Sequence, residues 1–581
     1  MSLSLDILPD EILHSILCFC SPCSAASLEQ VSRRFRHVTN EPLLWRFYCQ
    51  TYFKFWDRKH DMPSKLTESV WSVDWKELYI TRCLVDRAVT HVLDSILASQ
   101  TGRIEKFHTI ISFGYDVKDT LVRHSLAESS MEDHLARRYY AKSVLSCLHR
   151  SIAVSEWSSL VNGEHVSLEQ ALGAFDLFIP ESGYGDSNEI SAKLRGIVTE
   201  LLACNPDIEL LTPRVKALLV ASFLRENNLT GIESGRDYHC LEHNFLGFAL
   251  SDPGHNSLPL ISAAIYCYVA QNLGLNARPC GFPFHVHVIV IPPSGLDMDG
   301  NKLEDGILGQ PLYMDPFRSD RETPISDLEN QLNFLGASSV EKANFLGESL
   351  TSEIVLRCGK NILNSVEQIS QLPNPHLVPV DVASARYAAF WSSMLFTGAS
   401  RPMDLRNYLP WLMEIVVTEF PSDVYLIEKH ILPLFQGMLE YDDILDGLHV
   451  MQAVDGLPKQ VRRRTVRNKT VLYRIGQVFQ HRRYGYRAII TGWDAECGAS
   501  EQWMRTMNID QLQASSHQSF YHVLVEDKSV RYVAEENIEI ITPHVSELPR
   551  ALLAIAGKHF KRWDGVTRTF VSNMRDEYPD D

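Results

Sequence analysis

The first fifty residues constrain the fold most, because they carry more apolar side chain than so short a segment can bury by itself. Leu8, Ile12 and Ile16 recur at four-residue spacing, which is typical of one face of a helix. A second apolar stripe spans residues 28 to 38, and Pro42 is suited to open a third helix. Three short helices need a partner surface, either in the rest of this chain or in another protein.

The order of three motifs in this segment resembles an F-box. The motifs are Leu8-Pro9-Asp10-Glu11-Ile12, then Val31-Ser32-Arg33-Arg34-Phe35-Arg36, then Leu43-Leu44-Trp45-Arg46. The resemblance covers roughly residues 4 to 50 and implies docking on the Skp adaptor, and through it on the cullin scaffold, of a ubiquitin ligase. By position, it implies that the adaptor contact is made or supported by Leu8, Pro9, Ile12, Ile16, Leu28, Val31, Leu44 and Trp45. Periodicity alone favours a helical hairpin packed on the rest of the chain.

The composition is that of a soluble globular protein. At 581 residues the chain has room for three or four domains, and 45% hydrophobic with 22% charged residues gives no reason to expect extensive disorder. We see no basic segment followed by an apolar core near the start, and the longest apolar run, residues 258 to 270, is too short to span a bilayer. Twelve scattered cysteines fit reduced thiols. We therefore expect no membrane contact and a location in the cytoplasm, the nucleus or both.

Strand-forming residues dominate the C-terminal part of the chain. Glycines 476, 485 and 492 interrupt β-branched and aromatic runs, and residues 531 to 534 are placed to pair back onto a strand over 521 to 525. This pattern predicts a small β-barrel. The runs Tyr473 to Ile490, Phe520 to Asp527 and Tyr532 to Asn537 also resemble, in this order, the bacterial YccV/HspQ family, which is described as binding hemimethylated DNA.

Charge opposes the DNA-binding role that this resemblance implies. The chain has a net charge of -17, and residues 471 to 541 hold seven Lys or Arg against nine Asp or Glu. The basic residues just upstream either contact phosphate, form a solvated linker or signal nuclear import; they are Arg462, Arg463, Arg464, Arg467 and Lys469. Four further residues form either a patch for substrate or DNA or plain surface charge around a hairpin; they are His481, Arg482, Arg483 and Tyr486. Members of this bacterial family also act as protein-binding adaptors in proteolysis, and beside an F-box we favour that role over nucleic-acid binding.

The middle of the chain resembles a transglutaminase-like domain of the SirB type. The motifs are Gly235-Arg236-Asp237-Tyr238, His255 to Leu260, Gly281 to His287 and Tyr313 to Phe317. The three resemblances together are similar to F-box-only proteins of this architecture. In the catalytic members of the transglutaminase-like class, a cysteine at the start of the long helix acts with a histidine and an aspartate on neighbouring strands. By position, His285 and Asp315 match the last two, and the nucleophile position falls on Ser257.

Ser257 has two interpretations. It precedes a helix with Pro259 in its first turn, so it is placed to act as an N-cap. A Ser-His-Asp hydrolase is the alternative, but no G-x-S-x-G nucleophile elbow surrounds this serine. We favour a retired catalytic site that is reused as a scaffold or binding cleft, hence no enzyme.

We predict neither a cofactor nor a metal site. His239 and His243 lie four residues apart but lack an evident third ligand. The acidic loop over residues 297 to 301 has no glutamate at the spacing that a calcium loop requires. Cys280, a nearby thiol, is predicted to be buried beside a turn.

The predicted fold class is a multidomain α+β protein. Its parts are a three-helix F-box over 1–50, a helical linker region over 51–180, a mostly helical transglutaminase-like α+β domain over 181–375, a helical region over 376–457, a YccV/HspQ-like β-barrel over 458–545 and a tail over 546–581. Prolines 373, 375 and 379 mark the boundary before the second helical region. The predicted function is the substrate-recognition subunit of a Skp-cullin-F-box ubiquitin ligase with an unknown substrate protein. A DNA-binding regulator and a Ser-His-Asp hydrolase are the alternatives.

Overall fold

The computed structural model describes the chain in seven stretches. These are residues 5–179, 187–304, 306–371, 379–397, 402–464, 471–527 and 529–581. The proline-rich boundary segment over 372–378, Arg467 and Lys469 lie outside them. The chain divides into a terminal unit, Met1–Leu148 with Gln452–Asp581, and a central unit, His149–Met451. Helices and antiparallel sheets occur in the two units, which confirms the predicted α+β class.

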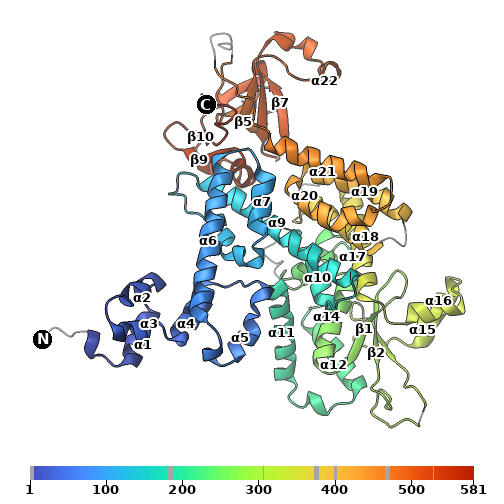
Figure 1. The fold of residues 1–581 in the computed structure, drawn as a ribbon. Helices are drawn as coiled ribbons and strands as arrows, with labels where there is room; N and C mark the ends of the chain where they lie inside the picture. Colours follow the sequence, from blue (N-terminus) through green and yellow to red (C-terminus); the bar gives the residue numbers. More distant parts are fainter. Residues whose placement is uncertain are drawn as a thin grey trace. The chain divides into compact units, whose positions relative to one another are not determined.

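The N-terminal segment forms four α-helices, rather than the predicted three, around a core to which Met62 and Trp75 of the following helices also contribute. They are α1 (Asp10–Cys18), α2 (Pro22–Leu28), α3 (Arg33–Thr39) and α4 (Pro42–Tyr52), drawn in blue in Figure 1. The apolar stripe predicted over residues 28 to 38 is divided between α2 and α3. Ser32 is the reason, because it is extended and its hydroxyl accepts the Phe35 N–H, so that a new helix begins there. The core of the segment is formed by Leu13, Leu17, Phe35, Val38, Leu44, Trp45 and Tyr48.

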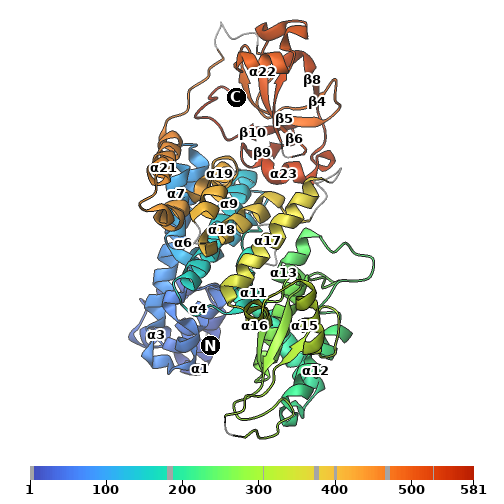
Figure 2. The same ribbon diagram turned by 90° about the vertical axis from the view of Figure 1, so that its right-hand side faces the viewer.

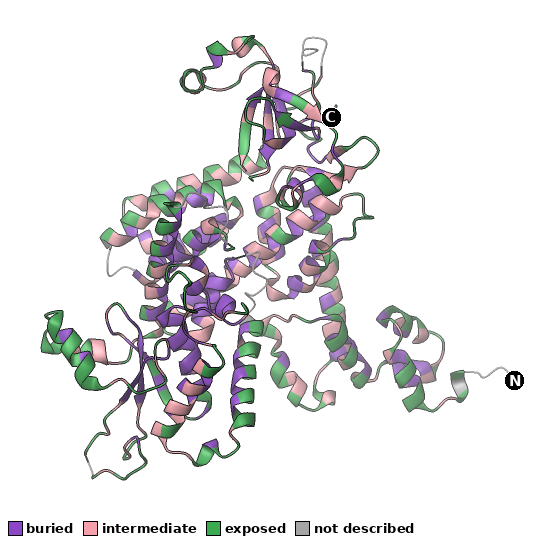
Figure 3. Cartoon of the chain, turned by 180° about the vertical axis from the view of Figure 1, so that it is seen from behind, coloured by how far each residue is buried: buried purple, intermediate pink, exposed green. Residues whose placement is uncertain are grey.

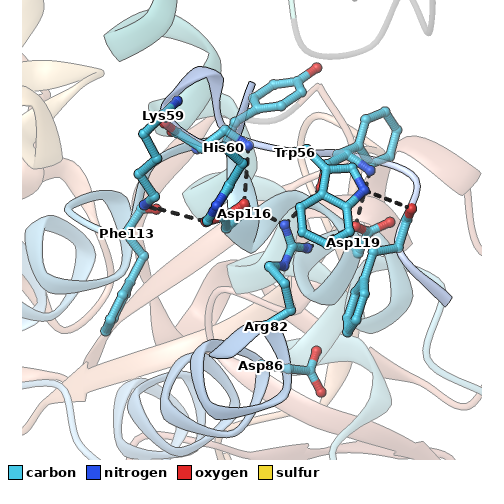
Figure 4. A network of polar contacts seen from close by, with 12 residues as sticks. Trp56, Lys59, His60, Arg82, Asp86, Phe113, Asp116 and Asp119 are labelled. Carbon is cyan, nitrogen blue, oxygen red and sulfur yellow. Dashed lines mark hydrogen bonds and ion pairs between the residues drawn. The ribbon is translucent and has the colours of Figure 1, made fainter. Parts of the chain in front are cut away.

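A buried arginine fastens the residues after α4 to the helices that follow. Those helices are α5 (Met62–Thr67), α6 (Trp75–Ala98), α7 (Arg103–Ile111), α8 (Lys118–Ser125) and α9 (His134–Val161). Arg82 of α6 is 1% exposed and pairs with Asp116 and, at 3.1 Å, with Asp119 (Figure 4). Its guanidinium lies 4.7 Å from the ring centre of Trp56, and His60 Nε2 lies 2.7 Å from Asp116. Two carboxylates and the aromatic contact therefore compensate the desolvated charge.

The C-terminal sheet has five antiparallel strands in the order β7-β6-β5-β4-β8. The strands are β4 (Val478–His481), β5 (Arg487–Asp494), β6 (Phe520–Val525), β7 (Val530–Ala534) and β8 (Ile538–Ile541). Figure 2 labels four of them together with α22 (Glu501–Thr506), and β7 is labelled in Figure 1. The pairing predicted for residues 531 to 534 is confirmed, because Tyr532 lies opposite His522 in the β6 and β7 register. Val478, Ile489 and Val523 are among the residues of the sheet's core.

Residues 546–581 are folded against this sheet, which corrects the predicted tail. They form α23 (Arg550–Ala556), β9 (Phe560–Asp564) and β10 (Thr569–Ser572). Leu552, Phe560 and Phe570 belong to the core of the sheet. The close approach of β10 requires Gly476, because a Cβ at that residue, whose φ is +89°, would overlap the Phe570 carbonyl. Burial of these apolar side chains is the reason that the segment does not remain a tail.

The central unit consists of helices around a three-stranded antiparallel sheet. The strands, in the order β1-β2-β3, are β1 (Asn276–Cys280), β2 (His287–Ile291) and β3 (Leu312–Met314). The helices are α10 (Leu168–Asp176), α11 (Ser187–Cys204), α12 (Pro213–Glu226), α13 (Leu246–Ala249), α14 (Pro259–Asn272), α15 (Ile325–Phe334), α16 (Ser339–Leu346), α17 (Thr351–Ser370), α18 (Val382–Thr397), α19 (Pro402–Thr418), α20 (Val424–Leu426) and α21 (Glu440–Gly456), the last of which continues into the terminal unit.

Helix α14 is largely enclosed by other elements of the central unit. It packs on β1, α11 and α12, and eleven of its fourteen residues are buried. This enclosure explains why the run over 258 to 270 is apolar on every side. Figure 3 shows which of the described residues are buried, in purple, and which are exposed, in green. Among the described helices, none is both long and apolar enough to cross a membrane.

Candidate functional site

The residues predicted for the adaptor contact fall into a surface group and a supporting group. Ile12 and Ile16 of α1 are 48% and 39% exposed, although each directly precedes a buried leucine, Leu13 or Leu17. The exposed and the buried stripe of α1 therefore lie side by side. Val31 and Pro9 are exposed as well, and Leu8 and Leu28 are partly buried. Leu44 and Trp45 are buried in the core of the segment. The structure therefore offers Ile12, Ile16 and Val31 as surface and places Leu44 and Trp45 beneath it.

Polar contacts hold α1 in place on the other helices. Arg34 of α3 donates to the Leu8 carbonyl and lies 2.7 Å from Asp10. The Tyr48 hydroxyl donates to the Leu17 carbonyl at 2.7 Å, and this bond is buried. These bonds fix the direction in which the exposed isoleucines of α1 point, which a recognition surface requires.

His285 and Asp315 lie together in the central unit, as the resemblance implied. His285 precedes β2, Asp315 follows β3, and the imidazole Nε2 lies 2.9 Å from the carboxylate. Burial by itself would raise the pKa of Asp315, but the hydrogen bond and the charge of His285 hold it below its usual value. Because its pKa is held low by these contacts, the buried Asp315 carboxylate is ionised at neutral pH and fixes the orientation of the imidazole.

Ser257 is placed differently from both interpretations of the sequence. Leu258 occupies the N-cap of α14 because Pro259 takes the first helical position, so the predicted N-cap role of Ser257 is corrected. The fully buried Ser257 hydroxyl lies 2.7 Å from the Ser262 hydroxyl. The partner of this hydroxyl is thus another hydroxyl, which is a poor general base.

Cys280 is buried, and it is no better nucleophile. Its thiol donates to the Phe345 carbonyl at 3.0 Å, and burial raises its pKa to about 11. The thiol is therefore protonated at neutral pH, and the thiolate is the reactive form of cysteine.

Two groups of possible metal ligands lie in the central unit. His285, His287 and Asp315 form one group, and Cys240, Glu242 and His243 form the other, each with its ligand atoms within 4.8 Å of one another. Burial lowers the pKa of His287 to about 4, so its imidazole is neutral. His287 closes the motif Gly281 to His287 but was not predicted as a ligand, although a histidine two residues after His285 is a signal for a shared site. In the second group His243 lies with Cys240 and Glu242, whereas the sequence suggested His239 as its neighbour.

A pocket of about 780 Å³ lies beside the start of α14, where the nucleophile of a catalytic member would be. Its walls are the first residues of α14, the loop over 284–286, Tyr238 with His239, and one face of α17. Phe284 on the rim is 86% exposed. The pocket is large enough for several residues of a peptide, so binding is the function that its geometry allows.

The residues of the predicted patch on the C-terminal sheet have different roles. His481 is buried, and its Nδ1 accepts the N–H groups of Arg483 and Tyr484, so it shapes the hairpin between β4 and β5. Arg482 and Arg483 are exposed, whereas Tyr486 is partly buried. Arg531 of β7 also belongs to this surface, although it was not predicted as part of the patch. Its guanidinium lies 4.4 Å from the ring centre of Tyr486.

The arginines upstream of the sheet are paired with acids of the same unit. Arg462 pairs with Asp494, Arg463 lies 3.2 Å from Asp580, and Arg464 lies 2.7 Å from Asp581. Arg464 also donates to the carbonyls of residues 471 and 473. Ion pairs within the folded domain therefore account for these three consecutive arginines, and no phosphate ligand is needed to explain them.

Comparison with protein families identifies three domains in this chain. Residues 5–51 match the F-box-like model, residues 188–360 match the model of the transglutaminase-like superfamily, and residues 471–567 match the model described as hemimethylated DNA-binding protein YccV like. The chain thus contains segments that match an F-box-like, a transglutaminase-like and a YccV-like domain, in the order that the motifs predicted.

Two relatives match nearly the whole chain. The F-box only protein 21 of Pongo abelii is 23% identical and that of Homo sapiens 22% identical, each over 99% of this chain and 92% of its own length. The F-box protein VBF of Arabidopsis thaliana is 29% identical over 20% of this chain and 38% of its own length. No solved structure matches the chain.

Proposed function

We propose that this protein is the substrate-recognition subunit of a Skp-cullin-F-box ubiquitin ligase. The observation that carries the proposal is the exposed aliphatic surface of Ile12, Ile16 and Val31 on helices that are already packed around a buried core. Exposed side chains of this kind, in a fold that is already packed, fit a partner protein. The resemblance of the whole chain to F-box only protein 21 supports the same role.

In this proposal the two groups of F-box residues act differently. Ile12, Ile16 and Val31 touch the Skp adaptor, whereas Leu44 and Trp45 hold the helices that carry them. The cullin binds through the adaptor and not through this chain. Ubiquitin transfer then belongs to other subunits, so that this chain acts on no bond.

The transglutaminase-like domain is proposed to bind substrate without catalysis. The Ser257 hydroxyl is paired with that of Ser262, and Cys280 carries a protonated thiol. The His285 and Asp315 pair then serves the shape of the domain. The rival hydrolase would require activity that is lost in His285→Ala while the fold remains intact.

The YccV-like domain is proposed to contact protein rather than DNA. The pairing of Arg462, Arg463 and Arg464 with carboxylates supports this choice, because phosphate binding rests on clustered free cations. The cytoplasm or the nucleus is the proposed location, and the twelve free cysteines agree with a reducing compartment.

Affinity purification followed by mass spectrometry tests the proposal. The wild-type chain is compared with Ile12→Asp/Ile16→Asp and with the control Leu84→Asp, whose leucine is 57% exposed on α6 outside the F-box. We expect Skp and cullin with the wild type and the control, but not with the double variant. If neither subunit is recovered with any of the three, or if the double variant retains both, the proposed docking is wrong.

A further inference from the structure

Arg357 is a charged residue in the pocket beside α14 that has no acidic partner among the described residues. It is partly buried, and its Nη1 donates to the Phe282 carbonyl at 2.7 Å. Desolvation lowers the pKa of this guanidinium, which means that its surroundings do not compensate its charge. An anionic ligand in the pocket would supply the missing partner.

A straight row of polar side chains leads away from Arg357 along α17. Arg357, Asn361, Asn364, Gln368 and Gln371 all line the pocket, and they follow one another at alternating spacings of four and three residues. This spacing keeps side chains on one face of a helix. Carboxamides both donate and accept hydrogen bonds, as the peptide backbone does. The row therefore offers what an extended main chain needs.

The row has a direction. No residue of α17 before Arg357 lines the pocket, so the cation lies at one end and the carboxamides extend from it one way only. At 1.5 Å per residue the row spans about 21 Å, which about six residues of extended chain cover at 3.3 Å each. If the anion at Arg357 were an internal acidic side chain, the peptide would have to continue past Arg357. A terminal carboxylate at Arg357 does not require this.

Phe284, on the loop that forms the facing rim, holds an unfavourable position. Its φ of 65° is left-handed, and its ring is 86% exposed. Both features cost free energy in the unbound chain, and such strain gathers at binding sites. The exposed ring is placed to cover an apolar side chain of a peptide in the pocket.

We propose that this pocket binds the C-terminal end of an extended peptide, with the terminal carboxylate at Arg357 and the backbone along the carboxamides of α17. The occupant is thus the chain end of a partner protein. Lys360 and Glu367 also line the pocket and oppose each other in charge, so Arg357 supplies the net positive charge at this end. The inference rests on the proposed function, because the partner would be the substrate that the ligase recognises.

Peptide pools with and without a terminal charge test this inference. Two pools of random-sequence hexapeptides, identical except for a free carboxylate or a terminal amide, are passed over the immobilised full chain, and the retained peptides are quantified by mass spectrometry. We expect the wild type to retain the free-acid pool at least about tenfold more than the amide pool, which corresponds to one charge-assisted contact. In Arg357→Met the ratio falls to about one. The control Arg195→Met, at an exposed arginine of α11, keeps the wild-type ratio.

Two further variants keep the test decisive if Arg357→Met melts early. Phe284→Gly removes the ring and the strain together, so we expect weaker retention with no loss of thermal stability. Asn364→Ala/Gln368→Ala changes exposed positions and is expected to weaken retention of both pools. Equal retention of the two pools by the wild type, selection of amide peptides through internal Asp or Glu, or full retention by both of these variants would overturn the inference.

Skp recovery in the same variants separates this inference from the proposed function. Arg357→Met is expected to recover Skp as the wild type does, because the F-box lies in the other unit. If the wild type retains the free-acid pool selectively but recovers no Skp, the pocket inference is supported and the ligase role is refuted. If it recovers Skp but shows no selectivity for the free acid, the ligase role is supported and the pocket inference is refuted.

Discussion

Titration of Asp176 should make the stability of the central unit depend on pH. This residue ends α10, is fully buried, and accepts the Gly247 N–H at 2.9 Å. Its second carboxylate oxygen has no hydrogen-bond partner among the described residues. Burial raises the pKa of Asp176 to about 7, although backbone N–H groups of α13 oppose the increase.

The sign of the effect follows from the two states. The unfolded carboxyl has a pKa of about 3.9, so between that pH and pH 7 the folded chain holds a proton that the unfolded chain has released. The stabilisation is complete at the acidic end and is lost as the pH rises toward 7. With these values, linkage gives a loss of about 2.6 kcal/mol between pH 5 and pH 8.

Asp176→Asn removes this titration and should flatten the dependence. The difference in free energy of unfolding, variant minus wild type, should rise by about 2.6 kcal/mol between pH 5 and pH 8. A constant offset from the amide does not change this rise. In a unit of this size the gain equals roughly 5 °C in melting temperature.

Differential scanning calorimetry of the full chain at four pH values is the appropriate assay, because separate transitions can be followed in a multidomain protein. The control is Asp320→Asn, at an exposed aspartate of the same unit. Parallel curves for Asp176→Asn and the wild type would show that Asp176 is ionised in the folded state, which contradicts the reasoning.

Three further predictions concern the F-box, a buried ion pair and a thiol. Leu44→Ala should destabilise the F-box by about 2–5 kcal/mol and weaken Skp binding with it, whereas Ile16→Ser should weaken Skp binding in a calorimetric titration without lowering the melting temperature. Asp423→Ala should lower the free energy of unfolding of the central unit by about 3–5 kcal/mol. The reason is that the buried Arg150, whose Nε and Nη2 now lie 2.6 and 2.8 Å from the Asp423 carboxylate, loses its partner. A melting curve like that of the wild type would contradict this prediction. Cys280 should react with iodoacetamide at pH 8 far more slowly than the exposed Cys23, since its pKa is about 11, and peptide mass spectrometry that finds equal rates would contradict the assignment.

The helices of the F-box could be predicted where a capping residue coincided with an apolar stripe. Pro42 opens α4 as expected, but the break before Arg33 was missed. A serine inside an apolar stripe is compatible with a helix interior and with a cap, and packing against α1 and α4 decides between them. Periodicity describes one helix at a time and does not contain that packing.

The C-terminal segment was missed for a related reason. Leu552, Phe560 and Phe570 contribute to the core of the five-stranded sheet, but they lie eight to ten residues apart. At this distance neither a helical nor a strand period is visible. Only the sheet on which they pack gives these residues a common face.

The pocket shows the same limit from the side of function. His285 and Asp315 could be found because a catalytic pair leaves a motif, whereas the row from Arg357 to Gln371 has the pattern of any solvent-facing helix side. The row becomes a wall only because the loop over 284–286 and the start of α14 face it. Recognition surfaces are built from several elements, and a single sequence shows each element without its neighbours.

The His285 and Asp315 pair is also connected to the pocket through Phe317. Asp315 accepts the Arg318 N–H in addition to the imidazole and so shapes the turn that carries Phe317. The Phe317 ring packs edge-on against His285 on one side and Tyr238 on the other, and Tyr238 lines the pocket. In the proposed binding function this pair positions part of the pocket wall. The presence of both residues is therefore accounted for by a binding cleft, and it does not by itself indicate catalysis.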